Sequence, residues 1–487
     1  MLFLYSVSSS AQDTWLQGEF PSVNFSETDL GTSPQILEGV LGPKNQIYIG
    51  NNQNILKYNG VRWTKIQLEK NAQNEEDRER INKSKCQILY LTRNNKLFVL
   101  RGTSMGYVEY SKEGQEIYVP IYEKPKGEKF DKAHSVIELA NDDLIVSTPA
   151  KLFHIKDKTI ANFHFPKNVK GGSCVGVVKF FDDYLFKFAA KEGSKSSEQY
   201  FVLDVETGKF KPLKVDAKYL ALNPLFHFKV GNTSYLCTKN GQFFGVKKKK
   251  SGELTWGEIT QGFKGSLQNS RITQIKNWRD YILFGTENDG IIVMNGNGEI
   301  IRQFDLEDGM ESSFVGRFLF DHQNNLWVLL DNGVHFIELS SPISSFEKER
   351  GASATIQAMY MDENYKLLAT PTDLLVGQKQ RNRLMFQNEN VFQNVLFDIK
   401  KFETDFGEKY LVIDYNGVLE YDPVKKTKKF IANTAGFIMK QSPINKNLIY
   451  IGTIDGISSL EVTANGYEYK DVMTGLGGDV RKIACDQ

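Results

Sequence analysis

Long hydrophobic runs, proline and an excess of charge of one sign are all scarce in this 487-residue chain. No stretch beyond the N-terminus approaches the ~18 apolar residues with which a helix crosses a membrane. The 60 basic and 59 acidic residues nearly cancel, to a net charge of +1. This balance argues against a nucleic-acid binder and against a basic membrane-surface patch. With 13 prolines against 40 glycines, 33 phenylalanines and 21 tyrosines, the composition favours strands joined by tight turns.

Cysteine and histidine are also few, and their spacing matches no metal site. The four cysteines, Cys86, Cys174, Cys237 and Cys485, lie in or beside apolar runs without a CxxC pair. We therefore expect buried free thiols rather than disulfides. The six histidines never occur as HxH or HExxH, and no Asp-x-Asp-x-Asp-Gly loop is present. We expect neither a metal site nor a cofactor, and no motif supports catalysis.

The first eleven residues resemble the end of a secretion signal. Residues 2–8 are largely apolar, and Ser9-Ser10-Ala11 follows with the small-x-small pattern that precedes a signal-peptidase cut. We interpret residues 1–11 as a signal-peptide remnant and Gln12 as the first mature residue. The alternative is an ordinary first strand. Export would place the chain outside the cytoplasm, with any membrane anchor beyond these residues.

One short pattern returns throughout the chain. It consists of a polar turn, an apolar strand, a turn of the Asn-Gly type and a second apolar strand. The first apolar strand of successive copies begins at residues 47, 97, 144, 185, 235, 282, 326, 367, 411 and 449. A period in the low to mid forties, with about four short strands per unit, is typical of β-propeller blades.

The connections between these strands have the composition of tight turns. Asn-Gly or Asp-Gly pairs, whose residues tolerate positive φ, recur between apolar runs. These pairs are Asn59-Gly60, Asn240-Gly241, Asp289-Gly290, Asn332-Gly333, Asn416-Gly417 and Asp455-Gly456. Together with the period they predict an all-β protein.

Ten copies exceed one ordinary ring of four to eight blades, so we expect two tandem β-propellers. The first would span residues 18–347 and have seven blades. Residues 348–487 would form the first blades of a second, truncated propeller. The segment from Gly475 to Asp486 repeats the approach to the strand that contains Trp327. We therefore expect the chain to stop within the fourth blade of the second ring.

Two of the repeats resemble a known bacterial family. Residues 47–52 read Ile-Tyr-Ile-Gly-Asn-Asn and lead to Gly-Val-Arg-Trp at 60–63; residues 326–328 read Leu-Trp-Val and lead to Asp-Asn-Gly-Val at 331–334. These runs are similar to the two-component-regulator propeller repeat. That repeat forms the extracytoplasmic sensor region of hybrid two-component and triple-tyrosine-motif signalling proteins. The resemblance covers residues 18–486.

The resemblance implies a sensor. Such regions are periplasmic, and a membrane helix and an output module follow them, so a membrane anchor is expected downstream. It implies an unknown small-molecule or saccharide ligand, no catalysis in this chain, and a possible homodimer through C-terminal parts not in this sequence.

Ligands of propellers enter the central funnel lined by the innermost strands, or the groove where two rings meet. Aligning the repeats places four residues near such a funnel: Thr273, Gly316, Gln357 and Arg481. Core packing and solvent exposure explain their polarity equally well, so the ligand-contacting residues stay unknown. Two other functions remain open, a secreted propeller enzyme or lectin acting on polysaccharide, and a protein-interaction scaffold.

Overall fold

The computed structural model describes most of the chain. The described residues are 18–68, 79, 84–166, 169, 172–189, 199–213, 215, 223–248, 254–257, 267, 270–343, 345–346, 351–380, 383–473, 475 and 477–485. The proposed signal peptide at residues 1–11 lies outside them. The chain divides into two compact units, Phe20–Ile343 and Ser344–Gln487 together with the residues up to Glu19.

The prediction of an all-β protein is confirmed. Apart from one four-residue helix, α2 (Glu27–Leu30), and short 3-10 turns such as η1 (Pro43–Asn45) and η3 (Leu306–Asp308), the described elements are strands. Ten sheets are present in the described residues, nearly all of them four-stranded, and all are antiparallel except for the parallel pairing of β6 with β10. No described helix is long and apolar enough to cross a membrane.

Seven of these sheets belong to the unit Phe20–Ile343. Their strands, sheet by sheet, are β2 (Ile36–Leu41), β3 (Ile47–Asn51), β4 (Ile55–Tyr58) and β5 (Trp63–Lys65); β7 (Cys86–Leu91), β8 (Leu97–Arg101), β9 (Ser104–Tyr110) and β10 (Glu116–Glu123), with β6 (Gln67–Leu68) beside β10; β11 (Ser135–Glu138), β12 (Leu144–Ser147), β13 (Leu152–Lys156) and β14 (Thr159–Phe163); β15 (Ser173–Phe180), β16 (Asp183–Ala189), β17 (Gln199–Asp204) and β18 (Lys209–Leu213); β19 (Pro224–Val230), β20 (Thr233–Thr238), β21 (Phe243–Lys248) and β22 (Leu254–Gly257); β23 (Ile272–Trp278), β24 (Tyr281–Thr286), β25 (Ile291–Met294) and β26 (Ile300–Phe304); β27 (Val315–Phe320), β28 (Leu326–Leu330), β29 (Val334–Ile337) and β1 (Ser22–Phe25).

Three sheets belong to the other unit. Their strands are β30 (Ala358–Met361), β31 (Lys366–Ala369), β32 (Leu374–Gln380) and β33 (Arg383–Asn388); β34 (Leu396–Thr404), β35 (Gly407–Asp414), β36 (Gly417–Asp422) and β37 (Thr427–Ala432); β38 (Gly436–Gln441), β39 (Leu448–Thr453), β40 (Gly456–Thr463) and β41 (Gly466–Lys470).

The repeat found in the sequence corresponds to one strand of every sheet. Each of the ten starting residues lies within the second strand of a sheet, from Ile47 in β3 to Ile449 in β39. In β3, β8, β12, β24 and β28 every residue is buried. A strand covered on both faces needs a continuous apolar run, which is why this strand carries the clearest pattern.

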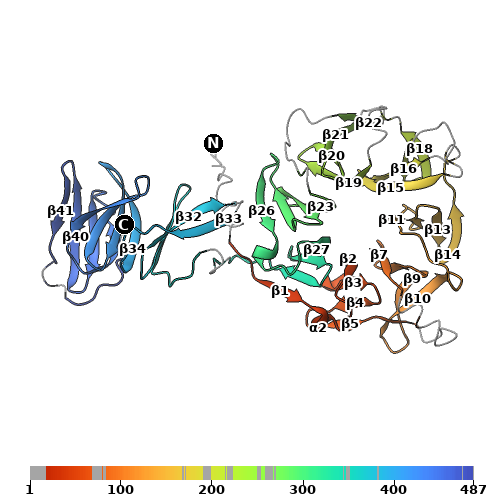
Figure 1. Ribbon diagram of the computed structural model, residues 1–487, viewed down its shortest axis with the longest axis horizontal. Coiled ribbons are helices and arrows are strands. Elements are labelled where there is room, and N and C mark those ends of the chain that lie inside the picture. The colour runs from red at the N-terminus through yellow and green to blue at the C-terminus, as the bar shows by residue number, and fades with distance from the viewer. Residues whose placement is uncertain are drawn as a thin grey trace, which may run out of the picture. The chain divides into compact units, whose positions relative to one another are not determined.

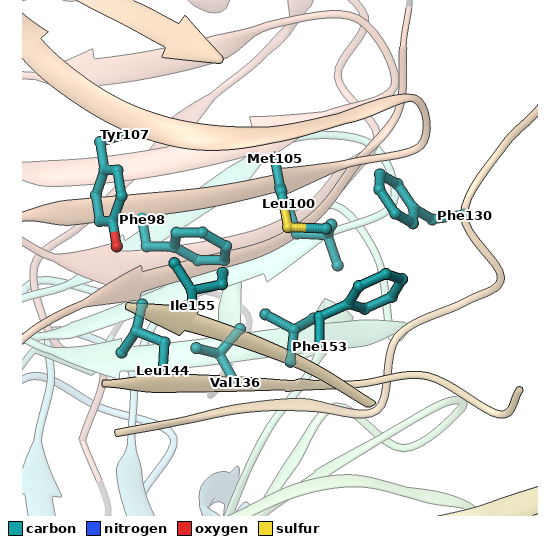
Figure 2. Packing of buried hydrophobic residues seen from close by; sticks show 10 residues of the cluster. Phe98, Leu100, Met105, Tyr107, Phe130, Val136, Leu144, Phe153 and Ile155 are labelled. Atoms are coloured by element: carbon teal, nitrogen blue, oxygen red, sulfur yellow. The ribbon is translucent and has the colours of Figure 1, made fainter. Parts of the chain in front are cut away.

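In the larger unit the sheets follow one another around a common centre, with the first strand of each sheet facing inward (Figure 1). Neighbouring sheets share hydrophobic cores. Figure 2 shows one of them, in which Phe98 and Leu100 of β8 pack with Val136 of β11 and Phe153 of β13. Equivalent layers lie between other successive sheets. Trp327 and Leu329 of the last sheet likewise share a core with Ile36, Ile47 and Ile49 of the first.

The last sheet of this unit takes a strand from the start of the chain. Strand β1 pairs antiparallel with β29, from Ser22 opposite Ile337 to Phe25 opposite Val334. The Phe25 ring packs 5.3 Å from that of Tyr58 and 5.9 Å from that of Trp327, measured between centroids. Strand β1 therefore completes the last sheet of the unit and also contacts the first sheet, which contains Tyr58.

All four cysteines are free; Cys86, Cys174 and Cys237 are buried as predicted, whereas Cys485 is only partly buried, so the prediction of burial was wrong for that residue. Burial raises the pKa of the Cys174 thiol to about 11 and that of Cys86 to about 12. These thiols stay protonated near neutral pH and serve as small apolar core groups, as the sequence predicts.

Candidate functional site

The first strands of the larger unit enclose a cavity of about 810 Å³. Every one of its seven sheets contributes lining residues from its first strand. These include Ile36, Gln87, Ser135, Val177, Leu225, Thr273 and Gly316. The volume lies within the range of about 300–1,000 Å³ that is usual for small-molecule sites.

In most of the first strands, a β-bulge places one residue on the wall of this cavity. In six of the seven first strands the pairing register slips by one residue near the start of the strand. A bulge leaves the extra residue out of the ladder and redirects its side chain. The extra residues are Leu37, Gln87, Val175, Leu225, Thr273 and Gly316, and all but Val175 line the cavity.

Two of the four residues that the sequence places near a funnel belong to this lining. Thr273 and Gly316 are both bulge residues of the cavity wall. The Thr273 hydroxyl donates a 2.6 Å hydrogen bond to the carbonyl oxygen of Val315, so it ties β23 to β27. Only the methyl group and the backbone of Thr273 therefore remain available to a ligand.

Gln357 and Arg481 belong to the smaller unit and line no part of this cavity. Gln357 is exposed, and its backbone N–H donates to the carbonyl oxygen of Ala369. The guanidinium of Arg481 lies 4.3 Å from the centre of the Phe437 ring and 3.2 Å from an Asp479 carboxylate oxygen.

The sequence analysis missed most of the lining. Leu37, Gln87 and Leu225 occupy the same bulge position as Thr273 and Gly316. The sequence did contain a signal for them: each bulge residue directly follows the first buried residue of its first strand, as Leu37 follows Ile36 and Gln87 follows Cys86. The charged residues of the cavity had no such signal, because charged side chains are common on exposed strand ends and turns and the sequence does not show which of them face the cavity.

Two carboxylates line the cavity, and both are in ion pairs. Glu287 lies 2.7 Å from the ammonium group of Lys239 and 3.2 Å from the guanidinium of Arg271. Glu38 lies 3.4 Å from Nε of Arg317. Both carboxylates of the lining are therefore engaged by cations of the protein itself.

One end of the cavity wall is aromatic and polar. Tyr90 and Tyr184 line it, and the Tyr90 hydroxyl donates to a carboxylate oxygen of Glu138 at 3.4 Å. Burial raises the pKa of both tyrosines, and the charge of Glu138 adds to the shift. Both hydroxyls are therefore neutral donors at physiological pH.

His134 also belongs to the lining. Its Nε2 lies 3.1 Å from the carbonyl oxygen of Cys174, so this nitrogen carries the proton and donates. Burial lowers the pKa of His134, and the nearby Lys132 lowers it further. The ring is neutral at pH 7 and ties the third sheet to the fourth. No described group of three or more His, Cys, Asp or Glu side chains is placed to hold a metal ion.

A second hollow, of about 610 Å³, lies in the smaller unit between β35 and β36 and the loop after β36. Its carboxylates are also paired: Glu408 with Lys401 at 2.5 Å, Glu420 with Lys409 at 3.0 Å and Asp422 with Lys425 at 3.3 Å. It is built from one sheet and its neighbour, whereas seven sheets converge on the central cavity, which makes the latter the stronger candidate.

Known proteins resemble this chain in structure but not in sequence. No family model and no curated protein matches it. Among solved structures, it is similar to one described as the extracellular domain of hybrid two-component system BT3049 from B. thetaiotaomicron. The TM-score is 0.58 at 13% identity, over 94% of this chain and 61% of that one.

Two further structures are less similar. An extracellular domain described as that of hybrid two-component system BT4673 from B. thetaiotaomicron has a TM-score of 0.47 at 12% identity, over 94% of this chain and 62% of that one. Virginiamycin B lyase from Staphylococcus aureus has a TM-score of 0.45 at 15% identity, over 66% of this chain and 100% of that one.

At these identities the likeness shows the fold alone. The chain has a β-propeller-like, nearly all-β fold shared with the extracellular domain of a two-component system. It spans about three fifths of the length of that neighbour.

Proposed function

We propose that this chain is the ligand-sensing extracytoplasmic region of a membrane-bound bacterial signalling protein of the two-component type. The observation that carries the proposal is the cavity of about 810 Å³ on which the first strands of seven sheets converge. The shared fold with an extracellular two-component domain supports it. In this proposal the chain binds a small molecule or a saccharide and catalyses nothing itself.

The proposal includes an architecture. The seven sheets of the larger unit are the blades of one seven-bladed propeller, and the three sheets of the smaller unit are the first blades of a second. The shared cores between successive sheets and the pairing of β1 with β29 support the first ring. Pairing between the two ends of the ring resists its opening, because separating the last blade from the first would also break a sheet.

A ligand in this cavity would act on many blades at once. It would contact first strands of several sheets, each joined to its neighbour by side-chain bonds such as Thr273 to Val315. A ligand shifts a conformational equilibrium only by its differential affinity for the two states. Binding would favour one spacing of the blades, and the downstream part of the protein would transmit that preference.

The binding step is tested by blocking the cavity. Gly316 has ordinary backbone dihedrals, and a Cβ there would meet its nearest atom at 3.4 Å, so Gly316→Phe places a ring in the cavity without backbone strain. Gly477→Phe is the matched control, because nothing lies within 4 Å of a Cβ at that site. A thermal-shift screen would use oligosaccharides, amino acids and organic acids.

We expect at least one compound to raise the Tm of the unmodified chain and of Gly477→Phe. At a hundredfold excess over Kd the gain is about 2.7 kcal/mol. Gly316→Phe should lose the response while keeping the circular dichroism spectrum of the unmodified chain. An equal response in both variants would place the binding site outside the cavity.

The signalling role is tested by reading the gene sequence beyond the codon for Gln487. The codons after that for Gln487 should encode a membrane-spanning helix of ~20 apolar residues and an output domain. A stop codon without such a helix would contradict the signalling role and favour a secreted lectin or enzyme.

A further inference from the structure

The central cavity has an excess of positive charge, although the chain as a whole is almost neutral. Five cationic side chains line it, from Lys85, Lys132, Lys179, Lys239 and Arg317, against the two carboxylates Glu38 and Glu287. Formally this is an excess of three positive charges in one cavity. The whole chain, with 60 basic and 59 acidic residues, is almost neutral. The excess is therefore local, and a concave site focuses it.

The ion pairs within the lining account for two of these cations. Lys239 pairs with Glu287, and Arg317 pairs with Glu38. Lys85, Lys132 and Lys179 have no ion pair with any carboxylate in the described part of the chain. They come from three consecutive sheets: Lys85 directly precedes β7, Lys132 precedes β11, and Lys179 lies in β15 opposite Tyr184, near the turn to β16 and so toward the other end of the cavity. All three are exposed, so their ammonium groups are available to a ligand.

A further lysine, which does not itself line the cavity, adds positive charge close to it. Lys276 of β23 is partly buried, near Arg317 and Glu38. Burial lowers its pKa, and the charge of Arg317 lowers it further, against the opposing effect of Glu38. One carboxylate thus faces two cations at this point. Like charges held together cost free energy that an anion in the cavity would offset.

A neutral or cationic ligand would find a poor match here. A cation would meet the excess positive charge, and both carboxylates that it needs are occupied. A neutral sugar would gain a hydrogen bond from Tyr184, since Tyr90 already donates to Glu138, but would leave three ammonium groups uncompensated. Lysine ammonium groups bind carboxylate and phosphate oxygens as point charges with three donors each.

We infer that the ligand of this cavity is an anion bearing carboxylate or phosphate groups, held by Lys85 and Lys132 at one end of the cavity and, where it is long enough, by Lys179 toward the other. The inference rests on the proposed function, since it assigns a ligand class to the cavity proposed there. An anion long enough to reach all three lysines would connect the first strands of three sheets through one set of contacts.

The experiment uses the full chain and three probes, two of them trisaccharides of similar size. Trigalacturonate carries carboxylates, tripolyphosphate carries phosphates, and maltotriose is neutral. The test variant is Lys85→Gln/Lys132→Gln/Lys179→Gln. The matched control is Lys65→Gln/Lys112→Gln/Lys156→Gln, which removes three exposed lysines of the same unit that lie outside the cavity. Binding is measured by calorimetry at about 0.05 M and about 0.5 M NaCl, a range over which salt screens charge pairs.

We expect trigalacturonate or tripolyphosphate to bind the unmodified chain and the control alike, and whichever of the two binds identifies the charged group. Each lysine contact should change Kd about tenfold, so the cavity triple variant should raise Kd at least about a hundredfold. Higher salt should weaken binding. Without ligand, the cavity variant should unfold at the same or a higher temperature than the control, because like charges have been removed.

Three outcomes would overturn the inference. One is that neither anion binds. Another is that an anion binds the cavity triple and the control triple equally. The third is that maltotriose binds, that Gly316→Phe blocks it, and that the lysine variants leave it unchanged. This last result refutes the anionic ligand but supports the sensor cavity, whereas binding of an anion that Gly316→Phe does not affect would refute the cavity as well.

Discussion

At the scale of single residues, the turn glycines show how much a dipeptide reveals. All six glycines of the Asn-Gly and Asp-Gly pairs have positive φ, as the sequence predicts, from 67° at Gly290 to 153° at Gly333. The structure adds a second reason for glycine. A Cβ at Gly290 would lie 2.0 Å from the carbonyl oxygen of Phe304, at the end of the fourth strand of the same sheet. The sequence contains no trace of this approach.

We predict that Gly290→Ala destabilises the larger unit far more than Gly60→Ala. Both sites have positive φ, but nothing lies within 4 Å of a Cβ at Gly60. Gly60→Ala should cost about 1 kcal/mol through backbone strain alone. Gly290→Ala should cost about 3 kcal/mol or more, because the backbone of Phe304 must move. Denaturant unfolding of both variants measures the difference, and equal free energies of unfolding would refute the steric argument.

At the scale of elements, the repeat is readable where strands are buried on both faces. The second strands satisfy this condition, and all ten were located from the sequence. The fourth strands do not: β14 and β18 are largely exposed and have no apolar run. Their existence followed only from the period. The short strand β1 was not recognised, because its partner β29 is 309 residues or more away in sequence and only tertiary structure joins them.

The pairing of β1 with β29 buries a histidine. His335 of β29 is fully buried, and its Nδ1 donates a 2.5 Å hydrogen bond to Oδ1 of Asn24 in β1. Its Nε2 has no hydrogen-bond partner in the described residues. Burial lowers the pKa of His335 to about 4 from an ordinary value of 6.5, although the charge of Asp308 opposes the shift. The folded protein therefore needs the neutral ring.

We predict that this histidine makes the larger unit sensitive to acid. Between about pH 6.5 and pH 4 the unfolded chain binds a proton at this site and the folded one does not, so the free energy of unfolding falls as the pH falls. Above about pH 6.5 the site contributes no pH dependence. The loss approaches about 3 kcal/mol at pH 4.

The measurement compares the unmodified chain with His335→Gln, which stays neutral and keeps a hydrogen-bonding group. Urea unfolding at pH 7 and pH 4.5 should show a smaller loss for the variant. His134 and His227, whose pKa values burial also lowers, contribute equally to both proteins. Identical losses in the two proteins would show that His335 is protonated in the folded state.

At the scale of the whole molecule, the boundary between the two units decides what folds together. The larger unit begins at Phe20 and ends at Ile343, so it contains both β1 and β29. Its cores are shared between successive sheets, and none of its seven sheets depends on a strand from the other unit. We therefore expect it to fold alone.

We predict that a fragment of residues 20–343 unfolds cooperatively with the Tm of that unit in the full chain. A fragment of residues 27–343 lacks β1 and with it Phe25, which packs on Tyr58 and Trp327. Phe25 is partly buried, and losing its ring together with the β1–β29 pairing should cost about 3 kcal/mol, so the Tm of this fragment should be lower by about 5 °C. Calorimetry of both fragments tests this. Equal melting temperatures would mean that β1 does not stabilise the ring.

What the sequence by itself determined is whatever depends on local pattern. Period, turn pairs and apolar runs give an all-β chain of ten repeated units, and apolar neighbours give buried free thiols. The cavity was determined only by the tertiary structure. Its bulge residues share a position that the repeat reveals once the register is known, whereas no local pattern marks which charged residues face it. Lys85, Lys132 and Lys179 are unremarkable in sequence, since each acquires its meaning from residues more than forty positions away, and only the packing of the sheets brings them to one cavity.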